Sequence, residues 1–350
     1  MSSEPVSRYC RSFGVVTVAI LAASFVGSAQ AGPISVAMVT VGDPGNLADP
    51  TMTGLGGSTF FAGAVNYVYQ IGKYDVTASQ YATFLNAVAA TDTYGLYNSN
   101  MATGSAAAGI IQSGAAGSYV YSVTPGHENF PVNYVSWGDS ARFANWLQNG
   151  QPTEAEGTGT TETGAYTLNG AISTTALMAV TRNPGATWFI PTEDEWYKPA
   201  YYKGGGPSAG YWPWPTQNNV APSNFLSATG TNNANYFAFG YTDPTNYLTS
   251  VGAFAASPGP YGTFDQGGDL FQWNETAVMG SSRGVRGGSF FDYGESMNSS
   301  VRGGDDPTDA LSGIGFRVAS VPEPSSAILV VAGIIALTVA TMAKRLRAQD

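Results

Sequence analysis

The segments with helical or strand periodicity in this chain are short, and long stretches rich in Gly, Pro, Ser and Asn separate them. The 350 residues include 44 Gly and 20 Pro. Capping-box patterns that begin at Thr77 and Thr192 predict two short helices, and Pro199 is expected to end the second of them. A further helix is expected to begin near Ser136, with Asp139 at its positive N-terminus. This patterning predicts an α+β fold with few elements and much irregular backbone.

Polar insertions separate the predicted helices. Residues 91–130 are expected to form a hairpin or a long loop, and residues 150–187 a loop with a short hairpin at 165–172. Residues 204–240 are rich in Gly and Pro and show little periodicity, which predicts an irregular surface region. Because neither an internal repeat nor a second periodic region is evident, residues 60–320 are interpreted as a single loop-rich domain.

The first 31 residues have the pattern of a secretory signal peptide. Two arginines precede an apolar run at 13–26, and Ala29, Gln30 and Ala31 form a small-residue cleavage pattern. A buried segment of the mature fold is the alternative, and it fits poorly because the run is apolar on all sides. We expect cleavage after Ala31, followed by a linker or an initial strand at residues 32–59.

The C-terminal segment, residues 321–350, has a second sorting pattern. VPEPSS precedes an apolar run at 327–343, and Lys344, Arg345 and Arg347 follow it. A helix of this length reaches about 25 Å, enough to span a bilayer, with the basic residues on the cytoplasmic side. The pattern resembles a PEP-CTERM sorting signal. This resemblance implies an exosortase-type protease as a partner in a Gram-negative envelope, whereas a plain membrane anchor is the alternative.

The charge and the cysteine count exclude several classes of function. Residues 32–321 contain 9 Lys and Arg and 21 Asp and Glu, a net charge of −12. No basic stripe is present, so nucleic acid is a poor partner. The single cysteine, Cys10, lies in the expected signal peptide. The mature part therefore has neither a disulfide nor a thiolate metal site, although the expected compartment is oxidising.

Four stretches, taken in order, carry the most specific pattern of the chain. They are PVNYVSWGDSARFANWL (131–147), FIPTEDEWYKPAYY (189–202), YGTFDQGGDLFQWNET (261–276) and the GGSFFDY, RGGDDP and GIGFR segments within 285–317. In this order they resemble the formylglycine-generating enzyme family, also called the sulfatase-modifying-factor domain. The resemblance covers roughly residues 60–320 and implies an irregular fold akin to that of C-type lectins.

The resemblance also implies a chemistry for which this chain lacks the residues. Enzymes of this family oxidise a substrate cysteine with a pair of cysteines that bind copper, and soft thiolates suit Cu(I). Counting on from the Gly-Gly-Ser strand that ends at Ser289, the two positions hold Asp292 and Met297. Neither side chain can form a thiolate, so formylglycine generation with copper is not expected. Related iron enzymes use a cluster of histidines, whereas this chain has only His127, so an iron site is not expected either.

Calcium is the cation that the sequence favours. In the resembled family a Gly-Asn-Val-Trp-Glu-Trp-type stretch carries a structural calcium, and the matching positions here hold Asp269 and Gln272. Carboxylate and amide oxygens are suitable calcium ligands. The alternative is that Asp269 caps a turn. Asp305, Asp306 and Asp309 form a second acidic group, which is interpreted as solvated loop carboxylates.

Three arginines and one aromatic cluster complete the set of candidate residues. Arg286, Arg302 and Arg317 match recurrent arginines of the family, and we expect them to pair with carboxylates and hold irregular strands together. Tyr211, Trp212 and Trp214 are candidates for a ligand surface, as is the tyrosine-rich insertion between Tyr94 and Tyr121, because aromatic faces on loops can stack on sugars or peptides. Packing beneath a long loop is the alternative for both.

These observations favour a non-catalytic member of the resembled family that is exported and sorted to the cell envelope or matrix. It is expected to bind a polysaccharide or a protein. The rival hypothesis is an oxidoreductase with a divergent metal site built from Asp292, His127 and neighbouring carboxylates. A third hypothesis is a purely structural matrix component.

Overall fold

The computed structural model describes residues 32–50 and 60–322, which belong to one unit of the chain, Ala31–Asp350. The expected signal peptide, with Cys10, and the expected spanning segment at 327–343 lie outside these residues. Within the two described ranges, no helix is long and apolar enough to cross a membrane.

Three helices begin at the predicted caps. Helices α1 (Ala78–Val88), α3 (Trp137–Gln148) and α5 (Glu193–Tyr201) each start with a complete capping box, whose first residues are Thr77, Ser136 and Thr192. In each box, the cap side chain and the third helical residue satisfy backbone N–H groups that the helix itself leaves free. Local sequence therefore determines where these helices start.

Helix α5 continues through Pro199 to Tyr201, so the expectation that Pro199 ends it is wrong. Proline lacks the N–H group that would donate to the carbonyl oxygen of Glu195. That oxygen instead accepts a hydrogen bond from the Tyr69 hydroxyl at 2.6 Å. A donor from a distant strand thus compensates for the missing helical bond.

The predicted insertions contain small elements. Helix α2 (Asn100–Thr103) and the hairpin of β3 (Ile110–Ser113) and β4 (Val120–Val123) occupy the first insertion, as expected. The hairpin expected at 165–172 does not form. Helix α4 (Thr174–Met178) lies just beyond it, and Tyr166 makes only an isolated bridge to Arg182.

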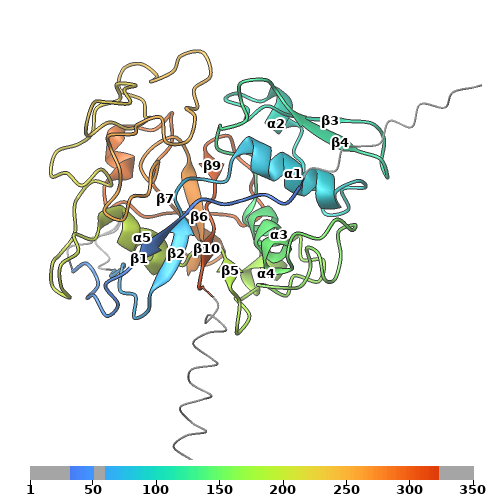
Figure 1. The fold of residues 1–350 in the computed structure, drawn as a ribbon, viewed down its shortest axis with the longest axis horizontal. Coiled ribbons are helices and arrows are strands. Elements are labelled where there is room, and N and C mark those ends of the chain that lie inside the picture. The colour runs from blue at the N-terminus through green and yellow to red at the C-terminus, as the bar shows by residue number, and fades with distance from the viewer. Residues whose placement is uncertain (1–31, 51–59, 323–350) are drawn as a thin grey trace, which may run out of the picture. The chain divides into compact units, whose positions relative to one another are not determined.

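Two four-stranded sheets carry most of the framework (Figure 1). The first has the order β1–β2–β10–β5 and is antiparallel throughout, so a strand near each end of the domain pairs with β2. The second has the order β8–β7–β6–β9, in which only β6 and β9 are parallel. The strands are β1 (Met38–Val41), β2 (Tyr69–Gly72), β5 (Trp188–Phe189), β6 (Phe271–Val278), β7 (Ser282–Arg286), β8 (Gly303–Asp305), β9 (Ile314–Gly315) and β10 (Ala319–Ser320).

The main core lies between α1, α3 and the sheets. Tyr81 and Phe84 of α1 contact the ring of Phe143 of α3, and Phe316, close to β9, contacts Tyr81 and Phe143. These side chains are fully buried. The result is a mixed α/β fold with few helices and short strands, as the sequence predicts, in which long loops lie on a small framework.

Candidate functional site

The loop that follows β7 holds both positions that match the family cysteines. Gly287 and Gly288 begin it with φ angles of 109° and 75°, values that favour glycine. A Cβ atom on Gly287 would lie 2.8 Å from the carbonyl oxygen of Gln266. The glycine pair thus lets the chain turn sharply against residue 266 and leads it to Ser289 and Asp292.

Ser289 and Asp292 close a tight turn. The Asp292 carboxylate accepts hydrogen bonds from the Ser289 hydroxyl and from the Ser289 backbone N–H, the latter at 3.1 Å. The Asp292 N–H donates back to the Ser289 carbonyl at 3.1 Å. Burial raises the pKa of the Asp292 carboxyl above its ordinary value, while the bonds from Ser289 lower it. The carboxylate therefore serves chiefly to fix the turn.

Met297 has a different environment. It is fully buried at the end of a 3-10 helix, η1 (Gly294–Met297), and its carbonyl oxygen accepts a hydrogen bond from Tyr201 at 2.9 Å. A Cβ atom on Gly267 or Gly288 would lie 3.3 Å from its side chain. Met297 therefore packs beneath the glycine turn, whereas Asp292 lies at its tip.

Exposed aromatic side chains lie on the Ser289–Asp292 turn and on the loops beside it. We call the following set the aromatic surface, with the exposed fraction of each residue: Phe225 (76%), Phe239 (98%), Tyr241 (39%), Phe291 (46%) and Tyr293 (60%). Contiguous exposed apolar patches are uncommon on soluble proteins, and large ones mark interaction sites. A pocket of about 470 Å³ lies between residues 224–226 and 238–242 and includes the first three of these side chains.

Ring contacts and a backbone hydrogen bond connect the parts of the aromatic surface. The ring of Phe237 lies 5.1 Å from that of Tyr241 and 5.7 Å from that of Tyr293. The Phe237 N–H donates to the Asp292 carbonyl at 2.9 Å, which attaches the 236–242 loop to the turn. Sequence reasoning missed this surface. The aromatic density of residues 225–247 was visible in the sequence, but the exposure of the rings depends on how the loops fold.

Arg286 and Arg302 share one carboxylate. Glu193, the first residue of α5, accepts hydrogen bonds from both guanidinium groups at 2.5–2.9 Å. Arg286 is 1% exposed and also donates to the carbonyl oxygens of Ser299 and Val301. The two arginines thus join β7 and the start of β8 to α5. Each guanidinium donates two hydrogen bonds to the Glu193 carboxylate, which fixes the orientation of the pair.

Arg317 lies in a second buried network. It donates to Gln272 at 2.6 Å and to the carbonyl oxygens of Gly72 and Phe264, both at 2.9 Å. The Oδ1 atom of Asp75 lies 3.3 Å from the Nη2 atom of Arg317. Burial lowers the pKa of the guanidinium, and Asp75 opposes that shift. Arg317 therefore links β2, β6 and the end of the domain.

The two candidate calcium ligands already have protein partners. One oxygen of Asp269 accepts from Asn235 at 3.0 Å and from the Thr249 N–H at 3.2 Å, and the other accepts from the Thr249 hydroxyl at 2.9 Å. The Gln272 oxygen accepts from Trp196 and Arg317, both at 2.6 Å. These bonds account for the polar atoms of both side chains without a cation. The calcium site stays a prediction.

The other candidate residues have mainly packing roles. Tyr211 is half-buried, its ring contacts Tyr197 and Tyr202, and its hydroxyl donates to the Leu47 carbonyl at 2.7 Å. Trp212 and Trp214 are also half-buried, and Lys203 lies 4.8 Å from the Trp212 ring.

The carboxylates and the histidine outside these networks lie on separate loops. The His127 ring contacts that of Phe130, with ring centroids 4.4 Å apart and the ring planes tilted by 39°. Asp306 accepts from Thr174 and Thr308. Burial and the neighbouring Asp305 raise the pKa of Asp309 to about 6. Over residues 32–50 and 60–322, no group of three or more His, Cys, Asp or Glu side chains is arranged to hold a metal ion.

Comparison with known proteins agrees with the family resemblance. Residues 64–321 match the family described as the sulfatase-modifying factor enzyme 1-like domain. The crystal structure of CarF is similar at 20% identity, with a TM-score of 0.51 over 83% of this chain and 99% of that one. Variable protein 1 of Treponema denticola is similar at 17% identity, with a TM-score of 0.50 over 83% and 97%. PvdO from Pseudomonas aeruginosa follows at 20% identity and a TM-score of 0.47, over 81% and 94%. No match was found among curated proteins.

Proposed function

This chain belongs to the sulfatase-modifying factor enzyme 1-like family, and we propose that it is a non-catalytic member that binds a polypeptide through the aromatic surface. The observation that carries this proposal is the aromatic surface itself. It lies on and beside the Ser289–Asp292 turn, close to the two positions where the family chemistry would require thiols. Those positions hold Asp292, in the turn, and the buried Met297, at the end of η1.

The chemistry of the turn supports binding over oxidation. A carboxylate is a hard ligand and a thioether cannot become a thiolate nucleophile, so Asp292 and Met297 do not fit the copper site of the family. Ser289 is fully buried and donates its hydroxyl proton to Asp292. An acyl-transfer role would need a histidine beside it, whereas the His127 ring contacts Phe130.

The composition of the aromatic surface favours a polypeptide over a glycan. Its most exposed members, Phe225 and Phe239, have no polar tip, and the neighbouring Leu226 is 48% exposed. A glycan needs hydrogen-bonding groups beside each stacked ring, whereas an apolar protein surface or an extended peptide needs mainly apolar area. The exposed Glu295 beside Tyr293 adds negative charge at the rim, which suits a basic partner.

Binding can be tested with peptide and glycan arrays that are probed with the purified chain. We expect signal on peptides that contain apolar and basic residues. The double variant Phe239→Ser with Tyr293→Ser should weaken that binding at least about tenfold. Val220→Ser, which alters a 68% exposed side chain outside the aromatic surface, should leave it unchanged. Signal on glycans alone, or equal binding by the double variant, would contradict the proposal.

The absence of catalysis is tested separately. A cysteine-containing sulfatase peptide is incubated with the chain, copper and O₂, and aldehyde is measured by mass spectrometry. We expect no aldehyde above a control without protein. Aldehyde formation that depends on Asp292 or Ser289 would favour the rival oxidoreductase hypothesis.

The proposed setting is the cell envelope, with an exosortase-type protease as the sorting partner. The pattern of residues 1–31 and the Pro-Glu-Pro segment before the apolar run at 327–343 support this setting. Mass spectrometry of the chain recovered from the envelope should find residues 1–31 and the apolar run missing. Replacing Pro322 and Pro324 with alanine should leave the C-terminal tail attached. A tail that is intact in the wild-type chain would favour a plain anchor.

A further inference from the structure

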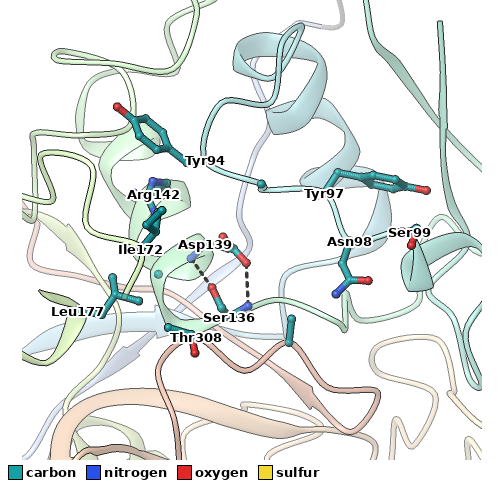
Figure 2. Close-up of a pocket in the computed structure, with 13 residues that line it drawn as sticks. Tyr94, Tyr97, Asn98, Ser99, Ser136, Asp139, Arg142, Ile172, Leu177 and Thr308 are labelled. Atoms are coloured by element: carbon teal, nitrogen blue, oxygen red, sulfur yellow. Dashed lines mark hydrogen bonds between the residues drawn. The ribbon is translucent and has the colours of Figure 1, made fainter. Parts of the chain in front are cut away.

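A separate pocket lies at the N-terminus of α3. Its volume is about 420 Å³, within the usual range for small-molecule sites. Residues 94–99 of the tyrosine-rich insertion form one wall, and Thr308 and Ala310 of the loop before β9 form another. Ser136, Asp139 and Arg142 form the floor (Figure 2). None of these residues belongs to the aromatic surface.

The floor of the pocket presents a carboxylate oxygen. Asp139 is 7% exposed, and its Oδ2 accepts a hydrogen bond from the Ser136 N–H at 2.9 Å. Within residues 32–50 and 60–322, its second oxygen accepts no hydrogen bond. Figure 2 shows the Asp139 carboxylate directed into the space that Tyr94 and Tyr97 flank. A buried carboxylate with one free oxygen favours a ligand that donates hydrogen bonds.

The surrounding charges make the pocket negative. Arg142, the only cation among the lining residues, is held by Glu162, with 2.7 Å between Nε and Oε1. Asp92 accepts from the N–H groups of Leu96 and Tyr97, and Glu156 accepts from that of Tyr94. These carboxylates fix the 93–97 segment and add negative charge beside Asp139. A negative, partly enclosed site attracts cations.

The walls add groups that suit a ring with several hydroxyls. The ring of Tyr94 lies 4.6 Å from the guanidinium carbon of Arg142, so one of its faces is already occupied and the ring is held in place. Asn98 and Ser99 supply an amide and a hydroxyl group on the side of the pocket away from Tyr94, and Thr308 supplies a hydroxyl group near Ser136. An organic ammonium group gains both from the carboxylate and from nearby tyrosine rings.

We propose that this pocket binds an amino sugar with a free amine, with the ammonium group on Asp139 and the hydroxyls on Asn98, Ser99 and Thr308. The ligand class follows from the free carboxylate oxygen, the uncompensated negative charge and the polar walls. The site does not depend on the polypeptide-binding role proposed above, because it uses different residues.

Calorimetric titration of the full chain with three matched sugars tests the proposal. Glucosamine should bind, whereas N-acetylglucosamine and glucose, which have the same ring without the charge, should bind at least about tenfold more weakly. Asp139→Asn keeps a cap acceptor for Ser136 and should reduce glucosamine binding to the level of glucose. Equal binding of the three sugars, or unchanged binding by Asp139→Asn, would overturn the proposal.

A second variant guards against a folding defect in Asp139→Asn. Ile172 lines the pocket and is 64% exposed, so Ile172→Trp should obstruct it without altering α3. This variant should lose glucosamine binding while keeping the wild-type melting temperature. The Phe239→Ser, Tyr293→Ser double variant should bind glucosamine normally, which separates a failure of this proposal from a failure of the polypeptide proposal. Retained binding by Ile172→Trp would place any sugar site elsewhere.

Discussion

Replacing Glu193 with glutamine should lower the free energy of unfolding by about 3–5 kcal/mol, the range for breaking a buried ion pair from one side. The Glu193 side chain is 7% exposed and pairs with Arg286 at 2.5 Å and with Arg302 at 2.6 Å. Arg286 is fully buried. Glutamine keeps the shape of the side chain but removes its charge and directs an amide donor at guanidinium donors. Two buried or half-buried cations would then lack their counter-ion.

Urea unfolding of the wild-type chain and the variant at pH 7 measures this effect. Glu295→Gln is the matched control, because Glu295 is exposed and its loss should change stability by no more than about 0.5 kcal/mol. A loss below about 1 kcal/mol for Glu193→Gln would mean that the carbonyl oxygens of Ser299 and Val301 satisfy Arg286 without the carboxylate.

The starts of α1, α3 and α5 could be predicted because the information that determines them is local. A cap side chain and the third helical residue decide each start, and both lie within four residues of sequence. The end of α5 could not be predicted, since the group that tolerates Pro199 is the hydroxyl of Tyr69 from another strand. The strands of two to five residues were also difficult, because such short pairings depend on which distant segments meet.

For the arginines, too, the local sequence indicates the residue but not the residue with which it pairs. Their positions in recurrent motifs indicated paired, buried side chains, but the partner of Arg286 and Arg302 lies in a different motif. One stretch of sequence predicts Asp269 and Gln272 as calcium ligands, and this stays a prediction. Their hydrogen bonds to protein groups reach Asn235, Thr249 and Trp196, which lie outside that stretch. Hydrogen-bond partners that are distant in sequence cannot be predicted from a local motif alone.

The aromatic surface was missed for a related reason. Phe225 and Phe239 lie in segments without periodicity, and nothing local distinguishes an exposed ring from a buried one there. Phe237, two residues before Phe239, is half-buried, and its ring contacts those of Tyr241 and Tyr293. Its N–H donates to the Asp292 carbonyl, a contact with a segment that is distant in sequence.

Asp75 should make the protein less stable as the pH rises from acidic to mildly basic. Its side chain is completely buried, and burial raises its pKa to about 8, although Arg317 opposes this shift. Its Oδ1 makes no hydrogen bond within the part of the chain that the structure describes. In the unfolded chain the pKa returns to about 3.9. Between these two values the folded state binds the proton more tightly, so the stability from this group is complete below pH 4 and is lost as the pH approaches 8.

Asp75→Asn isolates this contribution because asparagine resembles the protonated side chain. The wild-type free energy of unfolding should fall between pH 5 and pH 8, by about 4 kcal/mol at most from this group. The variant should lose this part of the slope and be the more stable protein at pH 8. Asp265 and Asp269 also titrate with raised pKa values, but they are unchanged in the variant, so the difference between the two slopes reports Asp75. Equal slopes, or a variant less stable at every pH, would mean that Asp75 is ionised and serves as the counter-ion of Arg317.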